Sequence, residues 1–308
     1  MTAYLIQRIL WIVPVLLAVT VITFVLMHQV PGGPWDRAKR LPPQALENID
    51  REYDLDRPVW EQFGRYVFGL AQGDLGVSFR SRNRPVSDVL VSGIRVSATL
   101  GVLALAVSVT VGVGLGVASA LRRNSIVDYA AVAFATVGAS VPSFILGMLL
   151  LVLFSAQLHW LPSGGWGSPQ QAVMPILALS ALPAAYIARI TRASMLDVLQ
   201  QDYVRTARAK GLREQVVALR HILRNALIPV LTVIGPVAAM LVTGSFIVEH
   251  LFAIPGVGRT FVTSISGRDY GVIMGVTLFY AFVVVGANLI VDVLYAVVDP
   301  RIRYESRG

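Results

Sequence analysis

The sequence predicts an all-α polytopic membrane protein, with six transmembrane helices and both termini in the cytoplasm. The chain has 308 residues, of which 55% are hydrophobic and only 14% are charged, and long uncharged stretches separate the charges. Soluble domains carry roughly 25% charged residues, and disordered chains combine low hydrophobicity with high net charge. The composition therefore argues against both classes. The chain also has no cysteine, which rules out a disulfide framework and a cysteine metal site.

Five uncharged stretches place the helices, because about 20 apolar residues cross a bilayer as a helix. The longest stretch, 129–188, contains two helices, since its middle at 161–171 is rich in turn-forming residues. The first stretch is longer than the core of a signal peptide and lacks an Ala-x-Ala-like cleavage site, so we expect it to be retained. The predicted helices span roughly 9–30, 97–120, 130–158, 172–188, 226–248 and 272–298.

Lys and Arg residues orient these helices, because short cytoplasmic loops carry an excess of them. If the N-terminus is cytoplasmic, the inner segments hold 14 Lys and Arg residues, whereas the two short outer loops hold only Arg259 and Arg268. The net charge of +8 is then largely this bias. A basic surface that binds nucleic acid is therefore not needed to explain it.

This topology divides the chain into parts. They are an N-terminal transmembrane helix at 1–30, an extracytoplasmic loop domain at 31–95, a five-helix core at 96–300 with a cytoplasmic hairpin at 189–225, and a cytoplasmic tail at 301–308.

Glycine and proline residues inside the predicted helices lead to two further predictions. Glycines in a membrane helix permit close helix packing, which we expect of Gly112, Gly114 and Gly116. Proline interrupts helix hydrogen bonding, so Pro142, Pro175 and Pro183 should shape or kink the third and fourth helices.

An amphipathic helix is predicted in the extracytoplasmic domain, where Trp60, Phe63, Val67 and Leu70 recur at helical spacing. Two interpretations of its aromatic residues stay open. They anchor the helix at the membrane interface, where Trp and Tyr collect, or they contact a soluble partner.

The cytoplasmic stretch 189–225 predicts two helices joined at Gly211, which we expect to end the first helix in a left-handed conformation. One apolar face holds Met195, Val198, Leu199, Tyr203 and Thr206/Ala207, and the period resumes at Val216, Leu219, Leu223 and Leu227. The opposite faces carry Arg205, Arg208, Lys210, Arg213 and Arg220. The hairpin either lies on anionic lipid headgroups or presents a rigid knob to a cytoplasmic protein.

The residues from Asp202 to Leu212 and from Arg220 to Pro229 resemble the cytoplasmic loop of ABC-importer permeases, and most closely the B-type permease of dipeptide and oligopeptide importers. The general loop reads Glu-Ala-Ala, three residues, Gly, nine residues, then Ile-x-Leu-Pro. Three positions match, namely Ala207, Gly211 and Leu223, and the departures usual in the peptide branch are Arg205, Thr206, His221 and Arg224. Five further pieces resemble the family in the same order: Arg8 with the first predicted helix, and the segments 73–79, 140–144, 249–258 and 288–303.

This resemblance implies the type I ABC importer permease fold in the bacterial inner membrane. The chain would form half of the translocation pathway for di- or oligopeptides, beside a second, C-type permease subunit, two ATPase subunits and an extracytoplasmic substrate-binding protein. Import of nickel, haem or glutathione by the same machinery is the alternative. The subunit would be non-catalytic and without a cofactor, because ATP and Mg²⁺ bind to the ATPase subunits. The chain indeed lacks the Gly-x-x-x-x-Gly-Lys-Ser/Thr phosphate loop.

Two rival classes fit less well. A secondary transporter needs ionisable groups within the membrane, and Asp292 is the one acidic or basic residue inside the predicted helices. A membrane metalloprotease would need a His-Glu-x-x-His sequence, which the chain lacks.

The resemblance also implies two sites, neither of them catalytic or metal-binding. The ATPase-coupling residues would be Tyr203, Arg205, Thr206, Ala207, Arg208, Ala209, Lys210, Gly211 and Leu212. A loop that contacts the binding protein and helps to release its ligand would include Phe252, Pro255, Gly256, Gly258, Arg259, Arg268, Asp269 and Tyr270. In the alternative, Leu251, Phe252 and Ile254 pack back onto the permease and close its outer mouth.

Overall fold

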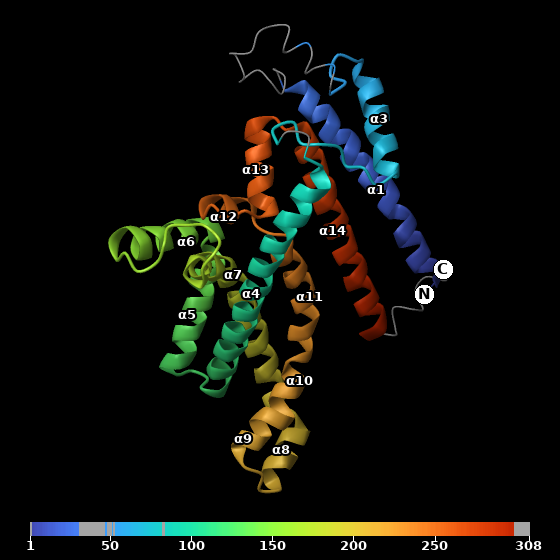
Figure 1. Ribbon diagram of the computed structural model, residues 1–308. Coiled ribbons are helices and arrows are strands. Elements are labelled where there is room, and N and C mark those ends of the chain that lie inside the picture. Colours follow the sequence, from blue (N-terminus) through green and yellow to red (C-terminus); the bar gives the residue numbers. More distant parts are fainter. Residues whose placement is uncertain (1, 31–46, 48–50, 52, 82–83, 299–308) are drawn as a thin grey trace. The chain divides into compact units, whose positions relative to one another are not determined.

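The computed structural model describes residues 2–30, 47, 51, 53–81 and 84–298, and these residues are almost entirely helical (Figure 1). The β-structure found among them is one isolated bridge between Val77 and Pro85. The helices are α1 (Thr2–Gln29), α3 (Val59–Ala71), α4 (Val86–Leu121), α5 (Ile126–Ser140), α6 (Ser143–Leu150), the π-helix η1 (Leu151–Gln157), α7 (Pro169–Leu199), α8 (Asp202–Ala209), α9 (Glu214–Val216), the π-helix η2 (Val217–Leu223), α10 (Arg224–Ala226), α11 (Ile228–Val242), α12 (Phe246–Leu251), α13 (Val257–Gly267) and α14 (Tyr270–Val298).

Four described helical stretches are long and apolar enough to cross a membrane, namely Leu10–Gln29, Val86–Leu121, Pro169–Leu199 and Arg220–Leu251. Helices α5 and α6–η1 pass the same test only as a pair, and α14 contributes the shorter apolar stretch Tyr270–Gly286. The predicted all-α polytopic architecture is confirmed. The number of six crossings stays a prediction, because it depends on how the α5–α6 pair lies in the bilayer.

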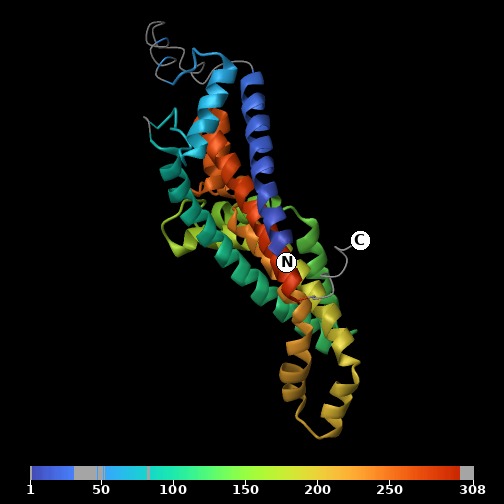
Figure 2. The same ribbon diagram turned by 90° about the vertical axis from the view of Figure 1, so that its right-hand side faces the viewer.

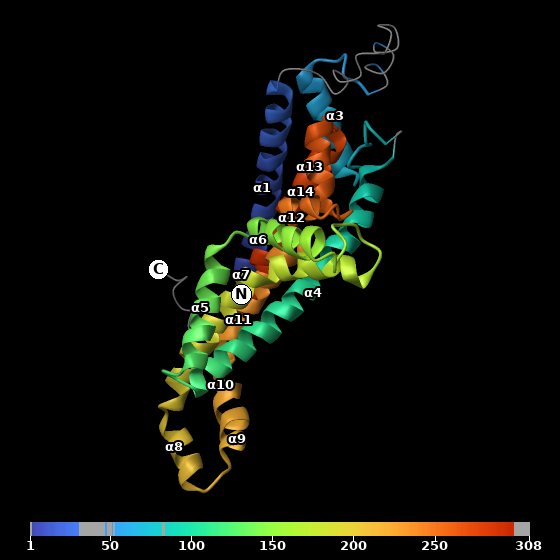
Figure 3. The same ribbon diagram turned by 90° about the vertical axis from the view of Figure 1, so that its left-hand side faces the viewer.

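The prediction of a single helix over 130–158 is wrong, because α5 and α6–η1 meet at an angle of 104°. Pro142 causes the break. A proline disfavours the helical conformation of the residue before it, and Val141 is extended, with φ −93° and ψ 120°. Figure 3 shows α6 running across the end of α5. Pro175 and Pro183, by contrast, are buried inside α7 and do not divide it.

The chain forms two compact units, one of residues 1–95 and 256–308 and the other of residues 96–255. In the second unit, α4 packs closely on α7. A Cβ atom at Gly112 would lie 2.7 Å from the Ala184 carbonyl oxygen, and one at Gly116 would lie 2.5 Å from the Thr191 Cβ. Glycine is therefore required at both positions, as the sequence predicted. Gly114 has no such neighbour within 4 Å.

An ion pair ties α5 to α7 in the same unit. The Asp128 side chain is 3% exposed, and its Oδ1 and Oδ2 accept hydrogen bonds from the Arg192 guanidinium at 2.8 and 3.0 Å. The Ser119 hydroxyl of α4 donates to the same carboxylate at 2.5 Å, and the Asn124 backbone N–H donates at 2.9 Å. Asp128 thus joins three helices at one point.

In the first unit, α1 lies along α14 (Figure 2). Phe24 and Met27 of α1 pack against Ile273 and Met274 of α14. A second cluster joins the start of α4 to α13 and α14, and its buried members are Val86, Leu90, Val257, Val272 and Val276.

We predict that Asp128→Ala lowers the free energy of unfolding of the purified protein, because it leaves the Arg192 charge without its partner. Denaturation in mixed micelles measures the change. Asp88→Ala, at an exposed acidic residue of α4, is the control and should have little effect. The double change Asp128→Ala/Arg192→Ala should recover part of the loss. Wild-type stability of the single variant would contradict this account.

Candidate functional site

The hairpin between α7 and α11 consists of α8, α9, η2 and α10 and extends beyond the ends of α7 and α11 (Figures 1 and 2). Its two arms share a buried apolar cluster. Val204 and Ala207 of α8 pack with Val217 and Ile222 of η2. The cluster continues into the helices that carry the hairpin through Ala120 of α4, Met195 of α7 and Ala226 of α10.

Two details of the predicted apolar face are wrong. Tyr203 was expected inside and is 41% exposed, while the neighbouring Val204 is fully buried. In the second arm Val216 is 39% exposed, and Val217 and Ile222 are buried instead. The side chain of Leu219 lies outside the described ones.

Both differences have a local cause. The chain leaves the helix at Gln200 and Gln201, which resets the angular phase of α8 relative to α7. In η2 the hydrogen bonds follow the π pattern, in which each turn takes one more residue, so the buried positions 217 and 222 are five apart instead of three or four.

The tip of the hairpin is a tight turn at Gly211, which has a φ of +74°. Its backbone N–H donates to the Arg208 carbonyl oxygen at 2.9 Å. The predicted left-handed glycine is thereby confirmed. A Cβ atom at this position would have no heavy atom within 4 Å, so a side chain would strain the backbone without striking anything.

The tip is solvent-exposed. Of the nine predicted coupling residues only Ala207 is buried, and the apolar Leu212 is 41% exposed. The charges at the tip are partly paired within the hairpin. Arg208 Nε lies 2.6 Å from Glu214 Oε1, and Arg205 lies 3.6 Å from Asp202. In the part of the chain that the structure describes, no acidic side chain forms an ion pair with Lys210.

A polar cross-link that the sequence did not predict joins the two arms. Asn225 Nδ2 donates to the Tyr203 hydroxyl oxygen at 2.8 Å and to the His221 carbonyl oxygen at 3.1 Å. Tyr203 therefore serves the hairpin through its hydroxyl group, and its partner is 22 residues away in the chain.

The second predicted site, the segment around α12, is largely core. Phe252 and Ile254 are fully buried in an apolar cluster with Leu100, Met174 and Val248, and Leu251 packs against that cluster. The Phe252 carbonyl oxygen accepts the Gly165 N–H at 2.8 Å. Glu249 is also fully buried, and the Ser97 hydroxyl donates to its Oε1 at 2.8 Å.

The remaining residues of this second site are Pro255, in the same unit as Phe252, and six residues of the other unit. Gly256, Gly258 and Asp269 are buried, whereas Arg259, Arg268 and Tyr270 are partly exposed. Pro255 alone among the eight predicted contact residues is exposed. Residues 257–267 form α13 instead of an open loop.

Asp269 holds the segment that precedes α4 against the start of α14. The Ser78 hydroxyl donates to Asp269 Oδ2 at 2.5 Å, and the Phe79 N–H donates to Oδ1 at 3.0 Å. This arrangement is that of a structural carboxylate, since its oxygen atoms are occupied by groups of the same unit.

Residues 112–304 match the sequence model of a family described as the binding-protein-dependent transport system inner membrane component. The chain belongs to this family. Residues 1–100 match the model of the N-terminal region of such membrane components. The permease is accordingly a multi-pass protein of the bacterial inner membrane.

Individual relatives resemble the permease over its whole length. It is 43% identical to the dipeptide transport system permease protein DppB of Bacillus subtilis over 308 residues, which are 100% of both chains. It is 41% identical to the oligopeptide transport system permease protein OppB of Escherichia coli, covering 99% of this chain and 100% of the relative.

Solved structures support the fold. An amino acid ABC transporter crystallised with histidines matches with a TM-score of 0.53 at 17% identity, covering 68% of this chain and 93% of that one. The MetNI methionine ABC transporter in inward-facing conformations matches with a TM-score of 0.50 at 18% identity, covering 67% and 95% of the two chains. The predicted ABC importer permease fold is confirmed.

We predict that Phe252→Ala destabilises the purified permease by about 3–5 kcal/mol, because it opens a cavity in the core. Phe68→Ala removes the same ring from a side chain of α3 that is 68% exposed, and should change stability by no more than about 0.5 kcal/mol. Thermal unfolding in detergent measures both. If Phe252→Ala keeps wild-type stability and instead weakens docking of the binding protein, the residue is a contact residue.

Proposed function

We propose that this permease is one of two transmembrane subunits of an ATP-driven importer, and that it forms half of the pathway for di- and oligopeptides. The main support is that the entire chain is similar to permeases named for dipeptide and oligopeptide transport. Uptake of labelled dipeptides and longer peptides by cells that lack their own importers tests the proposal. If peptide uptake does not depend on this chain, and uptake of nickel, haem or glutathione does, the chain imports that substrate instead of peptides.

The proposed partners divide the work. Two ATPase subunits bind ATP and Mg²⁺ on the cytoplasmic side, a second permease subunit completes the pathway, and an extracytoplasmic binding protein delivers the peptide. This chain supplies no catalytic group in that scheme. Its task is to convert a movement of the ATPase subunits into a change of the pathway.

The hairpin is suited to that task because it is rigid at its base and exposed at its tip. Val204 and Val217 join the hairpin to Met195 of α7 and Ala120 of α4 in one buried cluster. Close-packed interiors transmit displacement instead of absorbing it. A push on the tip therefore moves α7 and α4 as a body, provided that the ATPase contacts differ in free energy between the inward- and outward-facing states.

Docking to a protein explains the tip better than a lipid surface does. A hairpin on anionic headgroups would direct its cations to the lipid. Here Arg208 is held by Glu214, and Leu212 is exposed at the end of the turn beside Gly211. A compact knob with an apolar end and mixed charge is the shape that a cleft in a partner protein accepts.

For the outer segment we propose the packing alternative. Phe252 and Ile254 fasten α12 into the core of their unit. A role in ligand release would then fall to three partly exposed residues, namely Arg259 and Arg268 near the ends of α13 and Tyr270 at the start of α14.

We predict that Gly211→Val abolishes peptide uptake and uncouples ATP hydrolysis from the binding protein, while the permease still inserts. A β-branched residue in the left-handed conformation costs roughly 1–2 kcal/mol, which the turn avoids by rearranging. Gly211→Asn is the matched control, because asparagine visits this conformation readily, and it should retain uptake. Normal uptake by the valine variant would remove the coupling role from this turn.

We predict that Lys210→Glu prevents co-purification of the ATPase subunits, whereas Arg220→Glu does not. Both residues are exposed, both belong to the hairpin, and both changes alter the net charge equally, but only Lys210 is at the tip. If the hairpin rests on lipid, each change weakens binding by about 1 kcal/mol and the ATPase subunits stay bound to both variants.

A further inference from the structure

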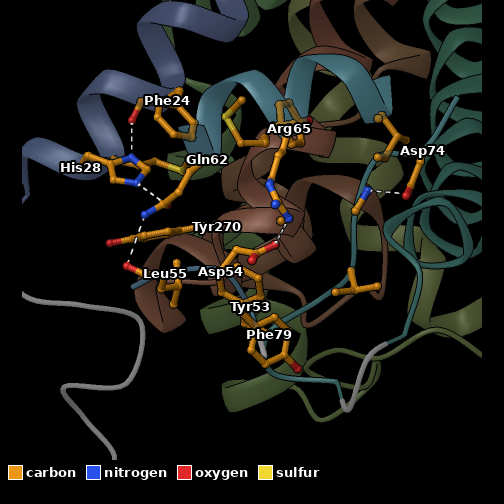
Figure 4. Close-up of a pocket in the computed structure, with 18 residues that line it drawn as sticks. Phe24, His28, Tyr53, Asp54, Leu55, Gln62, Arg65, Asp74, Phe79 and Tyr270 are labelled. Atoms are coloured by element: carbon orange, nitrogen blue, oxygen red, sulfur yellow. Dashed lines mark hydrogen bonds and ion pairs between the residues drawn. The ribbon is translucent and has the colours of Figure 1, made fainter. Parts of the chain in front are cut away.

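A cavity in the unit of residues 1–95 and 256–308 takes no part in the proposed function. It has a volume of about 340 Å³ and lies between α1, α3, the segment 74–79 and the start of α14 (Figure 4). Pockets that bind small molecules measure roughly 300–1,000 Å³ and are lined mainly by apolar and aromatic side chains with a few polar groups. The cavity fits this description at its small end.

Its wall is unusually aromatic. The aromatic lining residues are Phe24, Tyr53, Tyr66, Phe79 and Tyr270. The ring centroids of Tyr53 and Phe79 are 4.6 Å apart, and those of Phe79 and Tyr270 are 6.1 Å apart, so these three rings form a continuous surface. The face of an aromatic ring attracts a cation through its quadrupole, and a ring also accepts apolar groups.

One acidic residue of the wall has a carboxylate oxygen to offer. Asp74 Oδ1 accepts the Gly76 N–H at 2.8 Å, and the described residues provide no ion pair to this side chain. The other acid, Asp54, is already bound by Arg57 at 2.6 Å and by Arg65 at 3.0 Å. The positive charge of Arg65 is thus matched within the wall, and Asp74 leaves the lining with a net negative charge.

The Tyr66 hydroxyl does not offer a second acceptor to the cavity. Its oxygen atom is buried and has no hydrogen-bond partner among the described residues, so a molecule in the cavity does not reach it. The charge of Asp74 therefore decides which ligand the cavity accepts.

These groups select the chemistry of a ligand. A carboxylate or a phosphate would be repelled by Asp74, and a hydrocarbon would leave the Asp74 charge without a partner. An ammonium group carries three N–H donors and a positive charge, which suit a carboxylate and aromatic faces together.

We propose that this cavity binds a small organic ammonium ion, a primary amine on an apolar or aromatic group, that enters from the extracytoplasmic side, where residues 31–95 are predicted to lie. Its N–H groups donate to the Asp74 carboxylate, and its apolar part lies against Tyr53, Phe79 and Tyr270. The site does not depend on the nature of the transported cargo.

The test measures binding to the assembled transporter in nanodiscs, without the binding protein and without nucleotide. Phenethylamine is the probe, and 2-phenylethanol and 3-phenylpropionate present the same ring with a neutral and a negative end. Saturation-transfer NMR titrations, with empty nanodiscs as the baseline, should show the amine binding at least tenfold more tightly than either analogue.

Variants connect the binding to Asp74. Asp74→Asn keeps the acceptor for the Gly76 N–H and removes the charge, and it should weaken amine binding at least fivefold. Tyr66→Phe should leave binding unchanged, because the hydroxyl is buried away from the cavity. Asp88→Asn and Tyr129→Phe, at exposed residues outside the cavity, should leave binding unchanged.

Three results would overturn the proposal. The first is equal binding of the alcohol and the amine, which would indicate simple partition into an apolar space. The second is amine binding that survives Asp74→Asn. The third is the absence of any binding of the amine.

Discussion

A hairpin outside the membrane can move helices inside it only if its base does not yield, and here that rigidity comes from one apolar cluster. The cluster contains Val204, Ala207, Val217 and Ile222, which are buried together with residues of α4 and α7. Separating the two arms would expose these side chains to water. The Tyr203–Asn225 hydrogen bond adds a polar brace on the outer side. The turn at Gly211 and the charges around it are presented in a fixed direction because of this cluster.

The membrane explains why the sequence predicted so much of the fold. In lipid every backbone N–H and C=O group must be hydrogen-bonded within the protein. A helix achieves this within one segment, so a long apolar stretch is expected to be helical. Uncharged stretches therefore located α1, α4, α7, α11 and α14, and they placed several ends to within a few residues, such as Leu121 of α4 and Tyr270 of α14. The helices extend further, as α4 does to Val86 and α7 to Leu199, because a helix does not end where its apolar face ends.

The sequence did not predict two kinds of feature. These are contacts between residues far apart in the chain, and changes in which face of a helix is buried after a break in that helix. Asp128 and Arg192 are separated by 64 positions, and Ser78 and Asp269 by 191, so no local pattern links them. Pro142 was recognisable as a break, but the 104° angle depends on what α6 packs against, including Phe252 beside Gly147. Tyr203 was assigned to the apolar face because periodicity assumes an unbroken helix, and the chain breaks at Gln200 and Gln201.

The π-helix η2 gives the number of residues in the second arm a mechanical meaning. An α-helix turns by about 100° per residue, and a π-helix accommodates one more residue in each turn. Removing a single residue from Val217–Leu223 would let this arm return to α geometry. The part of the hairpin before it would then be rotated about the axis of α11. The length of this seven-residue element therefore sets the orientation of the tip about the axis of α11, independently of the side chains that the tip carries.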